Sequence, residues 1–177
     1  IGYQQGSPGT VVGDRIVQGA IRHVIEPVFE KEFAAHSYGF RPGRGCKDAL
    51  RRVDGLLKSG YRYVVDADFK SYFDTIPHDK LMKSVASRVV DGSMLALIKM
   101  FLVAPVIDER DGGRRTRPRM GTPQGGPASP LLANIYLHLL DRTQVAVGLL
   151  PQGGELLPEH LELLGHVDPL PIGQIEE

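Results

Sequence analysis

The chain has 177 residues, 42% of them hydrophobic and 24% charged, which is the composition of an ordinary globular protein. This composition excludes a collagen-like or wholly disordered chain, and the single cysteine, Cys46, excludes an internal disulfide. No apolar run reaches the roughly 18 residues of a membrane span, and no signal segment precedes the first helix. We therefore expect a cytoplasmic protein that has no membrane contact.

The charge is unevenly distributed, although the formal net charge of the whole chain is zero. Residues 143–177 contain six acids and no Lys or Arg, so residues 1–142 hold all 21 basic residues against 15 acids, a net charge of +6. A basic body predicts contact with nucleic acid, the alternative being a solvated surface of mixed charge. The same break predicts a domain over residues 1–142 and an unrelated acidic tail over 143–177, rich in Leu, Pro and Gly.

The first half of the chain shows two helical patterns. Apolar residues at spacings of three and four predict a helix that begins at an Asp14 N-cap and is interrupted by Pro27. A short second helical piece is expected just beyond Pro27. Gly and Pro predict a loop over residues 37–45, and a second amphipathic helix is expected over residues 46–59.

The second half alternates between strand and helix signals. Aromatic and β-branched residues predict a strand over residues 61–69. Helices follow over 78–90 and 93–103, and the sequence Asp111-Gly112-Gly113 predicts a hairpin turn between two short strands. A Gly-rich loop over 121–127 leads to a strongly apolar helix over 131–140, with Ser129 as its N-cap. No long periodicity continues after Thr143.

Two of these segments carry residues suited to binding a nucleotide. Asp66 and Asp68 point to the same side of the predicted strand, and two carboxylates side by side favour a bound Mg²⁺. A structural ion pair at the strand end is the alternative. In the loop 123–127, glycines let the backbone approach a ligand closely, while Gln124 offers both a donor and an acceptor. The alternative for this loop is a plain linker.

A third segment combines cationic and aromatic side chains. Arg41 and Arg44 suit phosphate, and the neighbouring Tyr38 and Phe40 can stack on bases. An ordinary surface loop anchored by its two aromatic residues is an equally good interpretation. Each of the three segments is a weak signal when it is taken alone.

Taken together, their order and spacing resemble the reverse transcriptases encoded by group II introns, over residues 11 to 141. The resemblance rests on three blocks: Asp14-Arg15-Ile16-Val17-Gln18 with Ser37-Tyr38-Gly39-Phe40-Arg41-Pro42-Gly43-Arg44; Asp68-Phe69-Lys70-Ser71-Tyr72-Phe73-Asp74-Thr75-Ile76; and Gly121-Thr122-Pro123-Gln124-Gly125-Gly126-Pro127-Ala128-Ser129-Pro130.

The resemblance implies a fold, an activity and a set of partners. The fold is α+β: an incomplete reverse-transcriptase palm and fingers, in which an antiparallel sheet carries helices on one face. The activity is RNA-directed DNA synthesis by nucleotidyl transfer with two Mg²⁺ ions. The implied partners are an RNA template, a DNA primer, intron RNA and a deoxynucleoside triphosphate.

Roles carry over to the residues that match the blocks. Asp68 matches the catalytic, metal-binding aspartate, and Phe69 would lend its backbone carbonyl to the metal. Ser71 and Tyr72 would offer backbone N–H groups to the triphosphate, and Phe73 would lie under the sugar. Gln124 and Gly125 would line the nucleotide pocket, and Arg41 and Arg44 would lie along the template or fingers surface. The role of Asp66 stays open, and Asp74 is expected to orient the turn before Pro77.

The sequence also departs from the family. The family's further catalytic acids lie in a Tyr-Ala-Asp-Asp hairpin after the helix at 129–141, and no Asp-Asp pair occurs in this sequence. A frameshift or truncation near residue 142 would explain both this loss and the acidic tail. Since one aspartate cannot position two metal ions, we expect the fragment to be inactive alone. The alternatives are a non-catalytic, maturase-like RNA-binding module or a non-functional truncated product.

Overall fold

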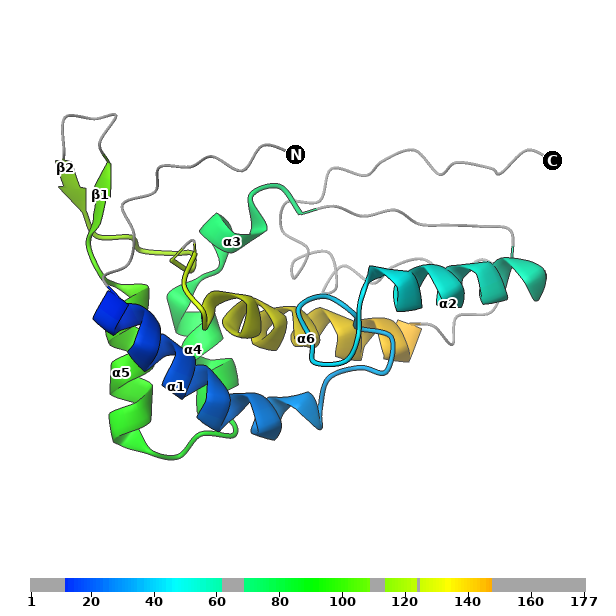
Figure 1. Ribbon diagram of the computed structural model, residues 1–177, viewed down its shortest axis with the longest axis horizontal. Helices are drawn as coiled ribbons and strands as arrows, with labels where there is room; N and C mark the ends of the chain where they lie inside the picture. The colour runs from blue at the N-terminus through cyan, green and yellow to red at the C-terminus, as the bar shows by residue number, and fades with distance from the viewer. Residues whose placement is uncertain (1–11, 62–68, 109–113, 124, 148–177) are drawn as a thin grey trace. The chain divides into compact units, whose positions relative to one another are not determined.

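A computed structural model describes residues 12–61, 69–108, 114–123 and 125–147. These residues are mostly helical and fall into two compact units (Figure 1). Of the described residues, the first unit comprises those within 12–33 and 72–137, and the second comprises those within 34–71 and 138–147. No helix in the described ranges is long and apolar enough to cross a membrane.

Helix α1 (Val12–Glu30) is one continuous helix that contains Pro27. The interruption predicted at Pro27 is therefore wrong, and Asp14 lies inside the first turn rather than at the cap. Proline removes the hydrogen bond to the carbonyl four residues earlier, which belongs to His23. Both residues are exposed, so water can satisfy that carbonyl, and the buried face of α1 is left intact.

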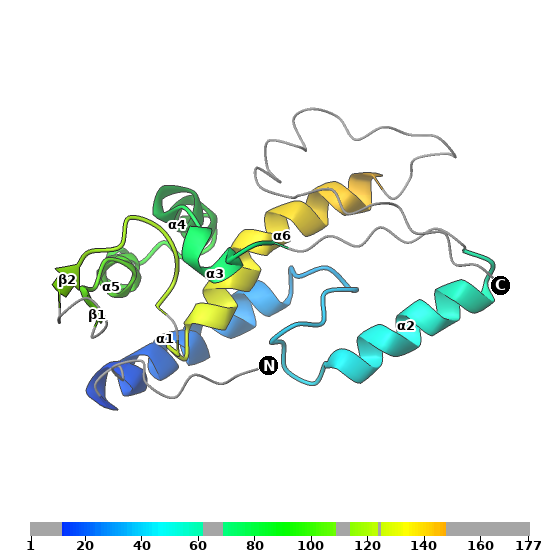
Figure 2. The same cartoon turned by 90° about the horizontal axis from the view of Figure 1, so that it is seen from above.

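Helices α4 (His78–Ala86) and α5 (Gly92–Leu102) form a helical hairpin in the first unit (Figure 2). Asp91 caps α5, because its carboxylate accepts a hydrogen bond from the N–H of Met94 at 3.0 Å. The helix expected over 93–103 is confirmed to within a residue, whereas α4 ends four residues before its predicted end.

Helix α6 (Ser129–Val147) is longer than the predicted 131–140. Its first half runs beside α1 and α4 (Figures 1 and 2). The apolar faces of these helices make the core of the first unit, whose largest fully buried side chains are Ile25, Ile76, Leu81, Val85, Ile98 and Leu102. The Ser129 hydroxyl does not cap the helix but donates to the carbonyl of Pro123 at 2.6 Å.

Strands β1 (Val106–Asp108) and β2 (Arg114–Thr116) confirm the predicted hairpin, with Ile107 opposite Arg115 in antiparallel register. They form the one sheet in the described part of the chain. Most of the strand predicted over 61–69 lies outside the described residues. The antiparallel palm sheet with helices on one face therefore stays a prediction, and what the structure establishes is a mainly helical body.

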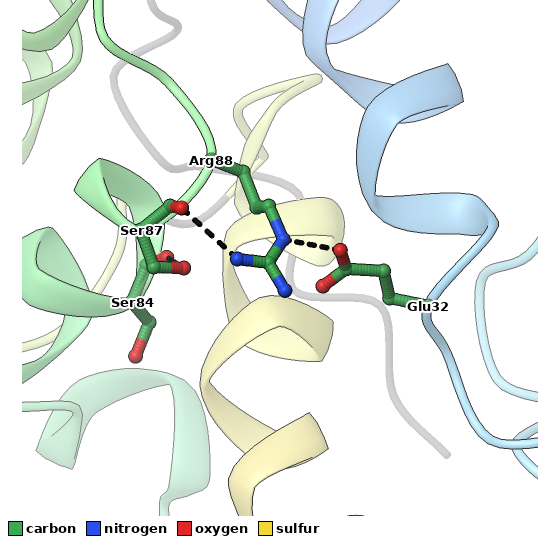
Figure 3. Close-up of polar contacts among 4 residues, drawn as sticks. All are labelled: Glu32, Ser84, Ser87 and Arg88. Atoms are coloured by element: carbon green, nitrogen blue, oxygen red, sulfur yellow. Dashed lines mark hydrogen bonds and ion pairs between the residues drawn. The ribbon is translucent and has the colours of Figure 1, made fainter.

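An ion pair joins two chain segments at the edge of the first unit (Figure 3). Arg88, just after α4, donates through Nε to Glu32, just after α1, and through Nη1 to the carbonyl of Ser87 at 3.1 Å. The Ser87 hydroxyl in turn donates to the carbonyl of Ser84 at 2.7 Å. Since both charged side chains are partly exposed, this pair contributes about 1 kcal/mol or less. Apolar burial is what holds the helices together.

Candidate nucleotide site

The block that begins at Asp68 continues into a single helical turn, α3 (Tyr72–Thr75), which the sequence patterns did not predict. The rings of Tyr72 and Phe73 meet edge to face, with centroids 5.9 Å apart and planes at 70°. The Tyr72 hydroxyl donates to the carbonyl of Ala133 in α6 at 2.9 Å. Helix α3 is thus fixed to the core helix through its first aromatic residue.

The Gly-rich loop pairs with α3 through the backbone. The N–H of Thr122 donates to the carbonyl of Phe73, and the N–H of Gly121 donates to the carbonyl of Ile76, both at 2.7 Å. An isolated antiparallel bridge joins Pro77 to Met120 beside them. These contacts hold the aromatic turn and the start of the loop in one frame.

Gly121 makes this close pairing possible. Its φ is +87°, and a Cβ there would lie 2.8 Å from the carbonyl oxygen of Asp74 and 2.9 Å from that of Phe73. The carbonyl of Gly121 accepts a hydrogen bond from His78, whose Nε2 lies 2.7 Å away and must carry the proton. No short-range signal pointed to this role of His78, because the two residues are far apart in the sequence.

The rest of the loop turns back toward α6. The N–H of Gly126 donates to the carbonyl of Pro123 at 3.3 Å, and the N–H of Ser129 donates to the carbonyl of Gly126 at 3.1 Å. Gly125 has a φ of +78° and open space around it. Gln124 lies outside the described residues. The described part of the loop therefore exposes backbone without a side chain at Gly125. Glycine at such a position lets the backbone approach a ligand closely.

The predicted nucleotide-site residues divide between the two units. Tyr72, Phe73 and Gly125 belong to the first unit and share the frame just described. Phe69 and Ser71 belong to the second unit; Ser71 is exposed and has a φ of +52°, which is uncommon for a residue other than glycine. Asp66 and Asp68 lie outside the described residues, so their predicted roles are not tested. Within the described ranges, no three His, Cys, Asp or Glu side chains gather as a metal site would require.

Arg41 is buried within its own loop, and its contact with the template or fingers surface stays a prediction. Its side chain is 6% exposed, and Nη1 donates to the carbonyls of Ala34 at 2.7 Å and Ser37 at 2.9 Å. A buried guanidinium is stable only where such acceptors surround it. Arg41 therefore holds the loop together from inside the second unit.

Arg44 and Phe40 are the exposed members of the same loop. Arg44 donates to the carbonyl of Ala35 at 2.5 Å and stays exposed just before helix α2 (Cys46–Lys58). Phe40 is 65% exposed, and its backbone has a φ of +54°. A bulky residue in this conformation is strained, and strain of this kind gathers at binding sites. The loop thus presents an aromatic ring and a cation.

A half-buried carboxyl group, that of Asp141, lies in the same unit. Burial raises the pKa of Asp141, and the nearby positive charges of His138 and Arg41 offset only part of that rise. Burial also raises the pKa of Tyr136 in the first unit, and the Asp79 carboxylate adds to the effect. Asp141 is thus a side chain whose ionisation works against the folded state.

Alanine substitutions at the two positive-φ glycines of the loop test its close backbone pairing with α3. Gly125→Ala should cost about 1–2 kcal/mol, because only the backbone conformation is unfavourable. Gly121→Ala should cost clearly more, about 3 kcal/mol or above, since its methyl group would also strike the backbone of α3. Urea denaturation of both variants measures the difference. Equal losses would contradict the close pairing.

The substitution Asp141→Asn tests the raised pKa of the half-buried Asp141. With the pKa of Asp141 raised by folding, the folded state binds more protons than the unfolded state, and stability falls as pH rises through that pKa. We expect the variant to be more stable than the original chain at about pH 7 and no more stable at about pH 3. Denaturation at both pH values measures this, with Asp54→Asn as a control, because Asp54 pairs with Lys58 on the exposed surface. A gain that does not depend on pH would contradict the assignment.

Comparisons with known proteins relate this chain to reverse transcriptases and to proteins encoded in introns. Residues 9–147 match the family model described as reverse transcriptase (RNA-dependent DNA polymerase). The chain is 43% identical over 128 residues to an uncharacterized 91 kDa protein in the cob intron of Schizosaccharomyces pombe, 40% identical over 129 residues to the group II intron-encoded protein LtrA of Lactococcus lactis, and 41% identical over 133 residues to protein YkfC of Escherichia coli.

These alignments cover 72–73% of this chain but only 15%, 21% and 34% of the three relatives. Among solved structures, a chain of a partial Cas6-RT-Cas1–Cas2 complex aligns with a TM-score of 0.48 and 25% identity, over 81% of this chain and 27% of that one. The family model matches well over half of the residues. The chain therefore belongs to the reverse transcriptase family and is related to the group II intron-encoded proteins.

Proposed function

We propose that this chain is the nucleotide- and template-binding part of a group II intron-type RNA-directed DNA polymerase, and that by itself it binds RNA without polymerising. The observation that carries the proposal is the pairing of α3 with the Gly-rich loop. Both segments lie inside the family match over residues 9–147. The pairing joins two blocks that the resemblance assigns to one nucleotide pocket.

The roles proposed in the pocket are those that the resemblance implies for the residues of these two blocks. Phe73 lies under the sugar of the incoming deoxynucleoside triphosphate, while Gln124 and Gly125 line the pocket beside it. Ser71 and Tyr72 offer backbone N–H groups to the phosphates. The exposed, positive-φ backbone of Ser71 supports this role, because such turns favour close contact between the backbone and an anion.

The proposed metal ligands suit a single Mg²⁺ better than two. Asp68 and the carbonyl of Phe69 would hold one ion together with oxygens of the triphosphate, a donor set that Mg²⁺ accepts. When bound, the ion would neutralise phosphate charge. The sequence has no Asp-Asp pair to supply the other acids, and a two-metal reaction needs a second ion about 4 Å away. The missing acids are the reason for proposing that the chain is inactive alone.

RNA binding is proposed for the basic body, whose net charge of +6 over residues 1–142 favours phosphate. Within it, the exposed Arg44 and Phe40 offer a cation and a stacking surface. The partners would be intron RNA or an RNA template with its DNA primer. A maturase-like module that binds RNA and has no catalytic role is the second candidate, and the missing acidic pair favours it.

Primer extension tests the catalytic part of the proposal. With Mg²⁺, an RNA template, an annealed DNA primer and all four deoxynucleoside triphosphates, the purified chain should yield no extended product. A commercial reverse transcriptase in the same buffer serves as the positive control. Template-dependent extension that is lost in Asp68→Asn would overturn the proposed inactivity.

RNA affinity tests the binding part. The chain should bind a labelled RNA whose affinity falls at least about ten-fold between ~50 and ~200 mM salt. Phe40→Gly should weaken binding about five-fold or more, because it removes a stacking ring. Glycine accepts the positive φ, so the fold should be as stable as before. Val90→Gly, at a residue 94% exposed, is the matched surface control. Unchanged affinity in Phe40→Gly would contradict the stacking role.

A further inference from the structure

Gln18 is a buried polar residue on the apolar face of α1. It shares that face with Ile21 and Ile25, at helical spacings of three and seven, and it is 2% exposed. A primary amide withdrawn from water is costly unless groups around it accept and donate hydrogen bonds. The free energy of burying Gln18 therefore depends on which polar groups lie around its amide, which is not so for its apolar neighbours.

A small cavity beside Gln18 shows which groups are available. It has a volume of about 10 Å³ and is bounded by Ile98 and Leu102 of α5 and by Leu132 of α6. Pro123 of the Gly-rich loop and Ser129, where that loop meets α6, complete the lining. A space of this size holds one water molecule at most, so no substrate enters it. The helix side of the cavity is apolar. The polar groups of this lining, apart from Gln18 itself, come from the loop.

Gly126 lies directly against the amide. A Cβ on Gly126 would fall on Oε1 of Gln18, 3.3 Å from its Cδ and 2.9 Å from Oγ of Ser129. Gly126 is not among the positive-φ glycines, so its backbone conformation does not itself require glycine. The Gln18 side chain takes the space that any larger residue at position 126 would need.

We propose that Gln18 is a positioning residue for the Gly-rich loop: its buried carboxamide packs on Gly126 and fixes the turn that joins Gly126 to Ser129. This inference rests on the proposed function for its consequence, which is that the backbone of Gly125 is held in place to receive a deoxynucleoside triphosphate. Gln18 touches no substrate. It acts through the loop, from a helix more than a hundred residues earlier in the chain.

Amide hydrogen exchange of Gln18→Met tests this without any ligand. Methionine keeps the volume and the burial but removes the carboxamide. The amides of Gly126 and Ser129 should then exchange about ten-fold faster, because without the packed carboxamide this turn opens locally more often. The amides of Gly121 and Thr122 should be unchanged, because they bond to Ile76 and Phe73 of α3. Unchanged exchange at Gly126 and Ser129, or an equal rise at all four amides, would overturn the proposal.

A double-mutant cycle gives an independent test. Gln18→Ala and Gly126→Ala should each lower the denaturation midpoint, whereas the double variant should lower it by less than the sum, since the new methyl group fits the vacated space. Gly19→Ala is the control on α1, because a Cβ there meets nothing within 4 Å. Strictly additive shifts would overturn the packing of Gln18 on Gly126.

A dATP-binding measurement distinguishes a failure of the proposed function from a failure of the role inferred for Gln18. The original chain should bind dATP in equilibrium dialysis, and Gln18→Met should bind it about ten-fold more weakly. If the original chain binds no dATP, the proposed function fails, while the exchange result still decides the role of Gln18. Equal dATP affinity in a folded Gln18→Met chain would overturn the positioning role.

Discussion

The backbone pairing between α3 and the Gly-rich loop is the constraint on which the rest of the candidate site depends. Two hydrogen bonds of 2.7 Å bring the loop onto the turn that carries Tyr72 and Phe73. Glycine at position 121 is the condition for this approach, because a side chain there would meet the backbone of Asp74. The rings of Tyr72 and Phe73 are thereby held at a fixed position relative to the loop backbone, although the two segments are far apart in the sequence.

The helical core keeps that pairing in place. Ile76 directly follows α3 and is 1% exposed, and α6 receives the hydroxyl of Tyr72 on the carbonyl of Ala133. Through Gln18, α1 reaches the far end of the same loop. The pairing of α3 with the loop is therefore supported by residues that lie outside the proposed nucleotide site. The resemblance assigns a catalytic role to one aspartate, Asp68, and the sequence contains no Asp-Asp pair.

The sequence predicted local elements well where apolar periodicity was strong. Helices α2 and α5 and the β1–β2 hairpin agree with expectation. The interruption predicted at Pro27 is wrong because α1 can contain a proline on its solvent-facing side. Which side of the helix faces solvent is decided by tertiary packing, which the local sequence does not reveal. Helix α3 is not predicted from the sequence, because a single helical turn is too short to show a periodic pattern of apolar residues.

Of the candidate site, the sequence identified the segments but not the contacts between them. Arg41 was expected at the surface, because a motif does not reveal that the loop folds its own carbonyls around the guanidinium. Gln18 did carry a signal, an amide at a helical spacing from Ile21 and Ile25, yet its neighbour Gly126 is visible only in three dimensions.

The most direct measurement of the central claim is a titration of the ¹⁵N-labelled chain with dATP and Mg²⁺, followed by two-dimensional NMR. If α3 and the Gly-rich loop form one nucleotide pocket, the amide signals of Phe73, Thr122, Gly125 and Gly126 shift together with a single dissociation constant. Signals of the helical hairpin α4–α5 stay in place. Shifts confined to other residues, or none at all at saturating dATP, would contradict the account.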